Sequence, residues 1–195
     1  MSTPIEELSH TVAVKDELCR GELAVRMMEI LRKVYRKERD SFVAGCYREL
    51  LGREPDPAGM QHHLRLLGGG TSKLTVLTSL LQCPEADRLY RSGPAPYAGG
   101  KRSSAADLFR GLYARSDEAY VQGLYEELLC RRPDRHGCKQ NVQQLKRGAS
   151  RATVAALLLQ SGEALELLRA KTGTPIAQKI LFDYANRKFY PDYDY

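Results

Sequence analysis

The sequence has no tryptophan, and its only aromatic rings besides histidine are eleven tyrosines and four phenylalanines among 195 residues. It also lacks any apolar run of about 18 residues or more, the length that a membrane-spanning helix requires. The segment MSTPIEELSH contains no basic stretch followed by an apolar core, so it does not predict a secretory signal. These absences predict a cytoplasmic protein without a transmembrane segment.

Cysteine is also scarce, and its five copies are an odd number without a Cys-x-x-Cys pair. Scattered thiols of this kind favour a reducing compartment and buried, unpaired cysteines over a disulfide framework. The few histidines do not complete a metal site. His62 and His63 are adjacent and so point to different sides of a helix, and His136 and Cys138 are too close in sequence for a helical chelate. We therefore expect no bound metal.

The motifs of common catalytic sites are missing as well. The sequence has no phosphate-binding loop of the Gly-x-x-x-x-Gly-Lys-Ser/Thr type, no nucleophile elbow and no calcium loop. A catalytic triad can assemble from residues that are distant in sequence, so an enzyme stays an open alternative, but no motif marks one. We expect a protein that is not an enzyme and that needs no cofactor.

Charge of one sign is only slightly in excess: 30 lysines and arginines face 24 aspartates and glutamates, for a net charge of +6. This balance suits nucleic acid, an anionic membrane or an acidic protein surface without selecting one. One basic cluster is predicted to lie on one side of a helix: Arg32, Lys33, Arg36 and Lys37. A solvated face is the plainer interpretation of this cluster. We expect a protein partner, keep a glycan as the alternative and do not favour nucleic acid.

The most informative feature of the sequence is an internal repeat at an offset of 78 residues. FVAGCYRELLGREPDPAG at residues 42–59 aligns without a gap with YVQGLYEELLCRRPDRHG at residues 120–137. Over residues 42–90 and 120–168, 21 of 49 positions are identical. A feature that the fold requires should occur in both units, whereas a feature of one unit alone is either incidental or a function of that unit.

The repeat divides the chain into five segments. The residues between the two units, RSGPAPYAGGKRSS, are rich in Gly, Pro and Ser and read as a linker. The stretch NRKFYPDYDY is rich in Tyr and Asp and has no helical period. We expect an N-terminal segment at 1–21, helical unit one at 22–90, the linker at 91–104, helical unit two at 105–170, and a C-terminal segment with this tail at 171–195.

Apolar residues recur at helical spacing in both units. From Phe42 to Leu51 they follow an i, i+1, i+4, i+5 pattern that is typical of an amphipathic helix, and the pattern returns in unit two. No stretch alternates as a surface strand does. The sequence therefore predicts an all-α fold of two similar units, each with about four short helices, the last ending near Glu85 in unit one. Since each buried apolar side chain contributes roughly 1.5–3 kcal/mol, each unit is expected to hold its own core.

The stretch LLGREPDPAG is predicted to form a corner between two helices. Pro55 lacks an N–H and disfavours helical backbone at the preceding residue, so the first helix must end there. Asp56, like Asp134 in unit two, then suits the N-cap of the next helix. Gly59 falls in the first turn, where glycine costs about 1 kcal/mol against alanine. Its recurrence in unit two predicts a close neighbour, either the Tyr47 ring or the Arg53 side chain.

Two interpretations of this corner stay open, and both involve the same candidate residues: Arg53, Asp56, Arg131 and Asp134. In the structural interpretation, which we favour, Arg53 pairs with a carboxylate such as Glu49 or bonds to exposed carbonyls at the helix end. In the functional interpretation, the Arg and Asp side chains and the N–H groups of the helix N-terminus bind a small anion or a sugar.

The run from Tyr47 to Gly59, Tyr-Arg-Glu-Leu-Leu-Gly-Arg-Glu-Pro-Asp-Pro-Ala-Gly, resembles an uncharacterised bacterial family of all-helical domains. Such domains often occur in tandem and stand beside glycosyltransferase and secreted modules. The pattern is similar, more weakly, to phycobilisome linker domains. The resemblance implies a non-catalytic binding or scaffolding module and supplies no catalytic residue. Two functions follow as hypotheses: a protein-interaction or scaffolding module of a bacterial assembly, and a carbohydrate-binding accessory domain linked to glycan synthesis or cell-surface machinery.

Overall fold

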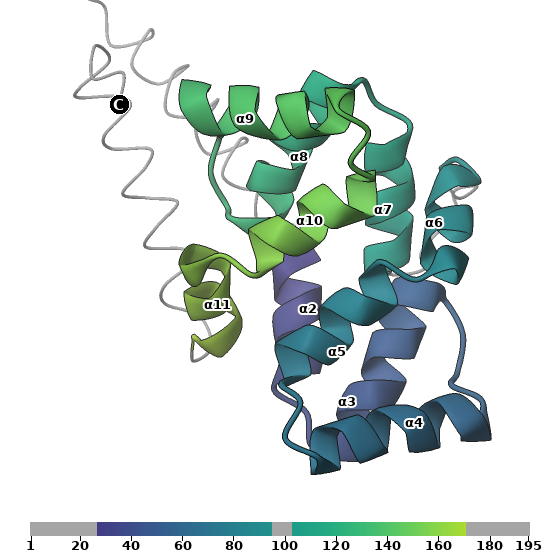
Figure 1. The fold of residues 1–195 in the computed structure, drawn as a ribbon. Helices are drawn as coiled ribbons and strands as arrows, with labels where there is room; N and C mark the ends of the chain where they lie inside the picture. The colour runs from purple at the N-terminus through teal and green to yellow at the C-terminus, as the bar shows by residue number, and fades with distance from the viewer. Residues whose placement is uncertain (1–26, 95–102, 171–195) are drawn as a thin grey trace, which may run out of the picture.

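The computed structural model describes residues 27–94 and 103–170, and these residues form helices joined by turns, without a β-strand (Figure 1). This confirms the predicted all-α fold. The predicted N-terminal segment, the Tyr/Asp-rich tail and most of the predicted linker lie outside the described residues. Within the described ranges, every helix is too short or too polar to cross a membrane.

The helices of unit one are α2 (Met27–Tyr35), α3 (Arg39–Cys46), the π-helical segment η1 (Tyr47–Leu51), α4 (Pro57–Gly68), α5 (Lys73–Leu81) and α6 (Pro84–Arg91). The helices of unit two are α7 (Ala105–Tyr113), α8 (Asp117–Leu128), α9 (Arg135–Lys146), α10 (Arg151–Leu159) and α11 (Gly162–Arg169). Each helix of unit two begins 78 residues after its counterpart, and α8 corresponds to α3 and η1 together. The tandem arrangement of two similar helical units is therefore confirmed.

Each unit has one more helix than expected in the described residues, because α6 and α11 are separate from the helices that precede them. Cys83 and Ser161 have extended backbone and act as N-caps, where each side chain accepts a hydrogen bond from the N–H three residues later. Pro84 then occupies the first position of α6, which a missing N–H suits. A residue that caps a new helix cannot continue the old one, so the predicted helix end near Glu85 is replaced by a helix start.

The two units are intertwined rather than placed end to end. The last helix of unit one, α6, packs against α7, the first helix of unit two, and α11 packs in the same way against α2 (Figure 1). In addition, α7 contacts η1 and α2 contacts α8. Like helices meet at the centre, where α2 contacts α7 and α5 contacts α10. This reciprocal pattern corresponds to an approximate two-fold relation between the units.

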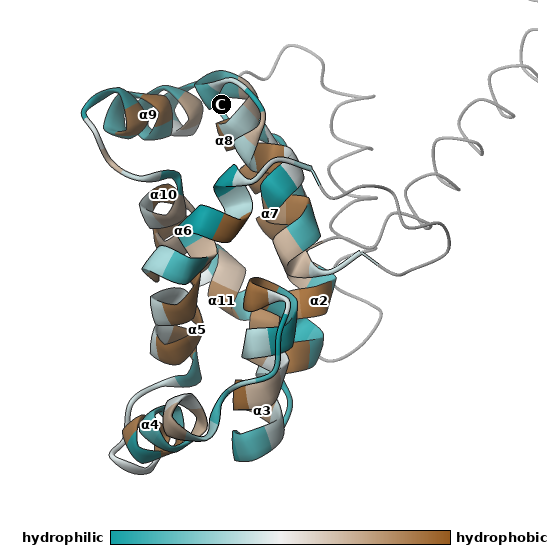
Figure 2. Ribbon diagram, turned by 90° about the vertical axis from the view of Figure 1, so that its right-hand side faces the viewer, coloured by the Kyte–Doolittle hydropathy of each residue, from teal (hydrophilic) through white to brown (hydrophobic). Residues whose placement is uncertain are grey.

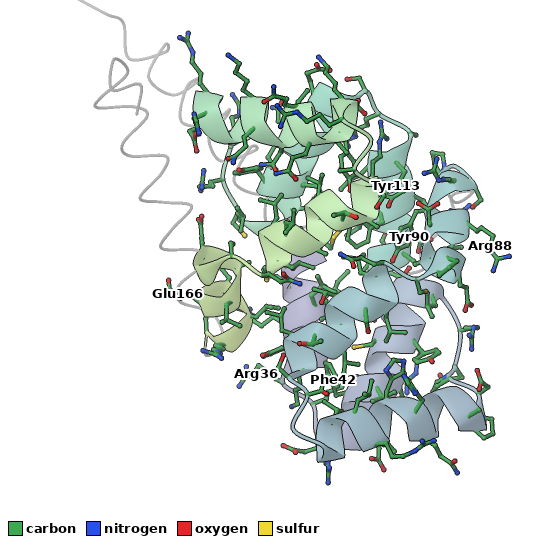
Figure 3. All side chains as sticks on the ribbon, in the orientation of Figure 1. Arg36, Phe42, Arg88, Tyr90, Tyr113 and Glu166 are labelled. Carbon is green, nitrogen blue, oxygen red and sulfur yellow. The ribbon has the colours of Figure 1, made fainter. Side chains whose placement is uncertain are left out.

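The hydrophobic core is shared by both units, which differs from the expectation of two separate cores. Figure 2 shows hydrophobic residues on α2, α3 and α7, and the buried side chains of both units form one cluster. Tyr90 of α6 stacks on Phe109 of α7 with ring centroids 4.9 Å apart, and its hydroxyl donates to the carbonyl of Leu50 at 3.0 Å. Tyr113 lies against the same Tyr90 ring (Figure 3). Two short helices per unit thus find their apolar partners in the other unit.

Candidate functional site

The predicted N-caps at the two corners are confirmed. The Asp56 carboxylate accepts a hydrogen bond of 2.8 Å from the N–H of Gly59 at the start of α4, and Asp134 accepts one of 2.7 Å from Gly137 at the start of α9. These bonds from the backbone lower the pKa of each carboxyl, because they favour its charged form. The carboxylates also lie at the positive end of a helix dipole.

Of the two neighbours predicted for the glycine in the first turn, the tyrosine ring and the arginine side chain, the structure shows the tyrosine. A Cβ atom built on Gly59 would collide with the hydroxyl of Tyr47, and one built on Gly137 would lie 2.6 Å from the hydroxyl of Tyr125. The tyrosine ring thus passes under the first turn of the helix and holds it close to the preceding helix. Any side chain at the glycine would push these two elements apart.

The corner arginine joins three elements in each unit. Arg53 donates from Nε and Nη2 to the two carboxylate oxygens of Glu85 at 2.5 and 2.8 Å, and from Nη1 to the carbonyl of Glu54 at 3.0 Å. Its guanidinium also lies over the Tyr47 ring, 5.1 Å from the centroid. The hydrogen bond from Arg53 lowers the pKa of Glu85. Each arm of the guanidinium therefore has a partner within the protein.

Unit two repeats this arrangement. Arg131 donates from Nε and Nη2 to Glu163 at 3.0–3.2 Å, donates to the carbonyl of Arg132, and lies over the Tyr125 ring. Because Glu85 and Glu163 each stand at the beginning of the last helix of their unit, the arginine ties the corner to that helix. The bidentate geometry is the strong form of such a pair.

The carboxylate that we expected to pair with Arg53, Glu49, has a different role. Glu49 accepts a hydrogen bond of 3.4 Å from the N–H of Ala105, the first residue of α7 in the other unit. Its counterpart Glu127 accepts one of 2.8 Å from the N–H of Met27, the first residue of α2. The repeated glutamate therefore satisfies the free N–H groups of a helix across the interface between units. Arg53 does pair with a carboxylate and bond to a backbone carbonyl, as predicted, but the carboxylate is Glu85 rather than Glu49.

The predicted basic stripe is not continuous in the structure. Arg32 is buried because α2 packs between α3, α7, α8 and α11. Its Nη1 atom has no hydrogen-bond partner among the described residues. Lys33 is exposed, whereas α2 ends at Tyr35 and leaves Arg36 and Lys37 in the turn that follows. The prediction that four basic side chains share one helix face is therefore wrong, because the other unit covers part of that face.

Metal-ligating and nucleophilic side chains are dispersed over the described residues. Within the part of the chain that the structure describes, no three His, Cys, Asp or Glu side chains are grouped as a metal site requires. Burial raises the pKa of the Cys46 thiol to about 12, so this cysteine stays protonated and unreactive at neutral pH. His63 is buried against the Tyr47 ring, and burial followed by the charge of His62 lowers its pKa.

The outer faces of α4 and α9, which lie at opposite ends of the molecule, were not among the predicted sites (Figure 1). Of the residues in α4, only Gly59 and Leu67 recur at the corresponding positions of α9. The segment RHGCKQNVQQLKR, residues 135–147, contains four arginines and lysines and no acidic residue, whereas α4 contains one arginine. This difference could have been found by comparing the charges of the two units helix by helix.

On α9, the exposed side chains of Arg135, Lys139 and Lys146 lie on one face, since they are four and eleven residues apart. Figure 3 shows nitrogen-tipped side chains standing out from this helix. Lys146 forms an exposed ion pair of 3.5 Å with Glu118 of α8. We name this surface, formed by Arg135, Lys139 and Lys146, the α9 basic face.

The comparison with known families agrees with the repeat. The model of a family described as a domain of unknown function, DUF4214, matches residues 31–90 and residues 102–168. No curated protein and no solved structure matches the chain. The two matches cover well over half of the sequence and coincide with the two helical units. The chain therefore belongs to the DUF4214 family and carries two copies of its domain in tandem.

Proposed function

We propose that the chain is a non-catalytic protein-interaction module of a bacterial assembly, and that the outer faces of α4 and α9 contact its partners. One observation carries this proposal: the residues that the two units share make internal contacts, whereas the exposed residues of α4 and α9 differ between the units. Two units with the same internal contacts but different outer faces suit a protein that binds two different partners and keeps them a fixed distance apart.

The shared residues support this division of roles. The corner arginine and aspartate and the glutamate of the same motif form hydrogen bonds within the chain, and the corner tyrosine packs against the glycine of the next helix and the guanidinium of the arginine. These internal contacts are enough to explain why the motif occurs in both units, and no ligand is needed to explain it. The weaker resemblance of the motif to phycobilisome linker domains is in keeping with a module that holds other proteins together.

The carbohydrate-binding hypothesis receives less support at this corner. A sugar is held mainly by polar groups that are free to bond with its hydroxyls, but the polar atoms of Arg53 and Arg131 already bond to Glu85 and Glu163. Replacing those bonds with bonds to a sugar would leave two carboxylates without their arginine. We therefore place the proposed contact surfaces away from the corner.

The test is affinity capture with the immobilised full chain from an extract of the cells that produce it, followed by quantitative mass spectrometry. The first variant is Arg135→Glu/Lys139→Glu, which reverses two charges of the α9 basic face. The control variant is Lys33→Glu/Arg88→Glu, which reverses the same number of exposed charges elsewhere; Arg88 points away from the body of the molecule (Figure 3).

We expect at least one protein to bind the wild-type chain saturably, to be retained by the control variant, and to be lost in the α9 variant or in the matching α4 variant Gln61→Glu/Leu66→Glu. Gln61 and Leu66 are both exposed on α4. Capture of no protein, or equal capture by all four chains, would contradict the proposal. Circular dichroism of each variant confirms that the fold is unchanged.

A further inference from the structure

An open groove lies between the beginning of α3 and the second half of α4, at the end of the molecule opposite α9 (Figure 1). Its volume is about 640 Å³, and the residues that line it are Arg39, Asp40, Gln61, Leu64, Arg65 and Gly68. Five of these six residues are exposed, and Leu64 is half-buried, so the groove combines polar walls with one apolar surface.

The charged side chains of this groove have no charged partner among the described residues. Arg39, Asp40 and Arg65 form no ion pair and no side-chain hydrogen bond with any residue in the described ranges. Arg39 occupies the first position of α3, and its Nη2 atom lies so close to Gly68 that a Cβ atom there would be 3.1 Å away. One arginine thus comes from each of the two helices that form the groove.

Unit two fills the corresponding place with its own side chains. Asp117 replaces Arg39 and bonds to Arg151 at 2.9 Å, and Glu118 replaces Asp40. Lys146 replaces Gly68 and reaches from α9 to Glu118 of α8 at 3.5 Å. Unit one has neither this lysine nor this ion pair, and the Arg39 guanidinium lies beside Gly68 instead.

We infer that the groove of unit one binds an acidic peptide segment of a protein partner. A carboxylate of that segment pairs with Arg39 and Arg65, and an apolar residue beside it packs on Leu64. Guanidinium groups bind carboxylates through two parallel hydrogen bonds, which adds geometric specificity to the charge attraction. Asp40 and Gln61 can bond to N–H groups of the peptide backbone. This inference rests on the proposed protein-interaction function and names the chemistry of one partner.

A sugar acid or a free phosphate shares the negative charge of such a peptide but fits the groove less well. No aromatic ring lines the groove within the described residues, and such rings usually provide the apolar surface on which a sugar packs. Leu64 instead offers a small apolar surface that suits an aliphatic side chain. A phosphate would use the arginines and leave Leu64 without a partner.

The test is an array of capped seven-residue peptides that combine two to four Asp or Glu residues with Leu at every spacing. Asn and Gln versions of each peptide serve as neutral controls. The best binder is then titrated into the ¹⁵N-labelled full chain, and amide shift changes locate its site. Inorganic phosphate and glucuronate are titrated under the same conditions.

The key variant is Arg39→Gln/Arg65→Gln, which removes both positive charges of the groove. Lys139→Gln is the control because it removes a cation from the α9 basic face instead. We expect shift changes at the beginning of α3 and the end of α4, and about tenfold weaker binding for the key variant. The control variant should bind as the wild type does.

A blank array, shift changes elsewhere, equal binding of the neutral peptides, or tighter binding of phosphate or glucuronate would each overturn the inference. Failure of the proposed function has a different signature. If the chain captures a protein in the extract experiment while the array is blank, the groove inference fails and the proposed function stands. If the acidic peptides bind at the groove but no protein is captured, the proposed function fails.

Discussion

The two units share one corner but complete it with different side chains beneath the tyrosine. In unit two, Asn141 donates from Nδ2 to the Tyr125 hydroxyl at 3.2 Å and to the carbonyl of Gly137 at 2.8 Å. In unit one, His63 occupies this place, and its buried Nδ1 has no partner among the described residues. The corner therefore tolerates a change in the side chain below it as long as the tyrosine, the glycine and the arginine stay in place.

A second difference lies where the preceding helix ends. Gly52 has a positive φ of 68°, and its counterpart Cys130 has a φ of 56° although it carries a side chain. In unit one the helix before the corner ends in the π-helical segment η1, whereas α8 stays α-helical to Leu128. The two units thus form the same corner with different backbone strain. The corner requires a positive φ at this position, but it permits either glycine or cysteine there.

The largest effect is expected when the comparison is broken by separating the units. A fragment of residues 103–195 lacks α6, so Phe109 of α7 loses its stacking partner Tyr90. We expect this fragment and the complementary fragment of residues 1–98, each studied alone, to lose most of the helical circular dichroism signal or to self-associate. The reason is that every core side chain that becomes exposed costs roughly 1.5–3 kcal/mol. An equimolar mixture with residues 1–98 should recover the spectrum. A monomeric fragment with a cooperative unfolding transition, checked by sedimentation, would show that a unit folds alone.

The next effect comes from the glycine of the corner. Gly59→Ala should raise helix propensity by about 1 kcal/mol, but its Cβ atom collides with the Tyr47 hydroxyl, so we expect a net loss of about 1–2 kcal/mol in the free energy of unfolding. Gly137→Ala should behave in the same way against Tyr125. Urea denaturation measures both variants.

The double variant Gly59→Ala/Tyr47→Phe sharpens this prediction, because it removes the hydroxyl that the new methyl group would meet. The loss should become smaller than in Gly59→Ala alone, and Tyr47→Phe by itself should change stability little. Equal losses with and without the hydroxyl would mean that the glycine is required for another reason, such as the approach of the whole ring.

The difference between His63 and Asn141 predicts a dependence on pH. Burial, followed by the charge of His62, lowers the pKa of His63 below its usual value of 6.5, so the unfolded state binds the proton more readily than the folded state. Stability should therefore fall as the pH drops below about 6.5 and be unaffected by this residue above it. His63→Asn should remove that part of the loss. The urea midpoints of the wild type and the variant at pH 7.5 and pH 5 measure this effect. An equal change of midpoint between the two pH values in both proteins would contradict the assignment to His63.

Features set by residues close in sequence were predictable. The caps by Asp56 and Asp134 and the role of the corner tyrosine follow from neighbours within one turn or one corner. The partner of Arg53 could not be predicted from the sequence, because Glu85 stands 32 residues away and only the packing of α6 brings it near. Glu49, one turn from Arg53, was the plausible local choice.

The intertwining of the units was also hidden from the sequence. A hydrophobic stripe on α2 or α7 fits a partner in its own unit as well as one in the other, and the repeat makes both choices look alike. The same ambiguity explains Arg32, which helical spacing places with exposed basic residues but which the other unit covers. The different faces of α4 and α9, by contrast, were available in the sequence, because the offset of 78 residues already aligns the two helices.

The smallest expected effect tests the backbone difference at the end of α8. Cys130→Gly relieves a left-handed conformation that costs an ordinary side chain about 1–2 kcal/mol, but it adds freedom to the unfolded chain and removes a buried thiol. The balance predicts a gain below about 1 kcal/mol, measured by urea denaturation. Gly52→Ala is the reverse change and should destabilise, because it brings the same strain into unit one without a side chain that packs as the thiol does. If both variants destabilise, the thiol of Cys130 contributes more by packing than its backbone costs, and the two units would have reached equally favourable solutions for the same turn.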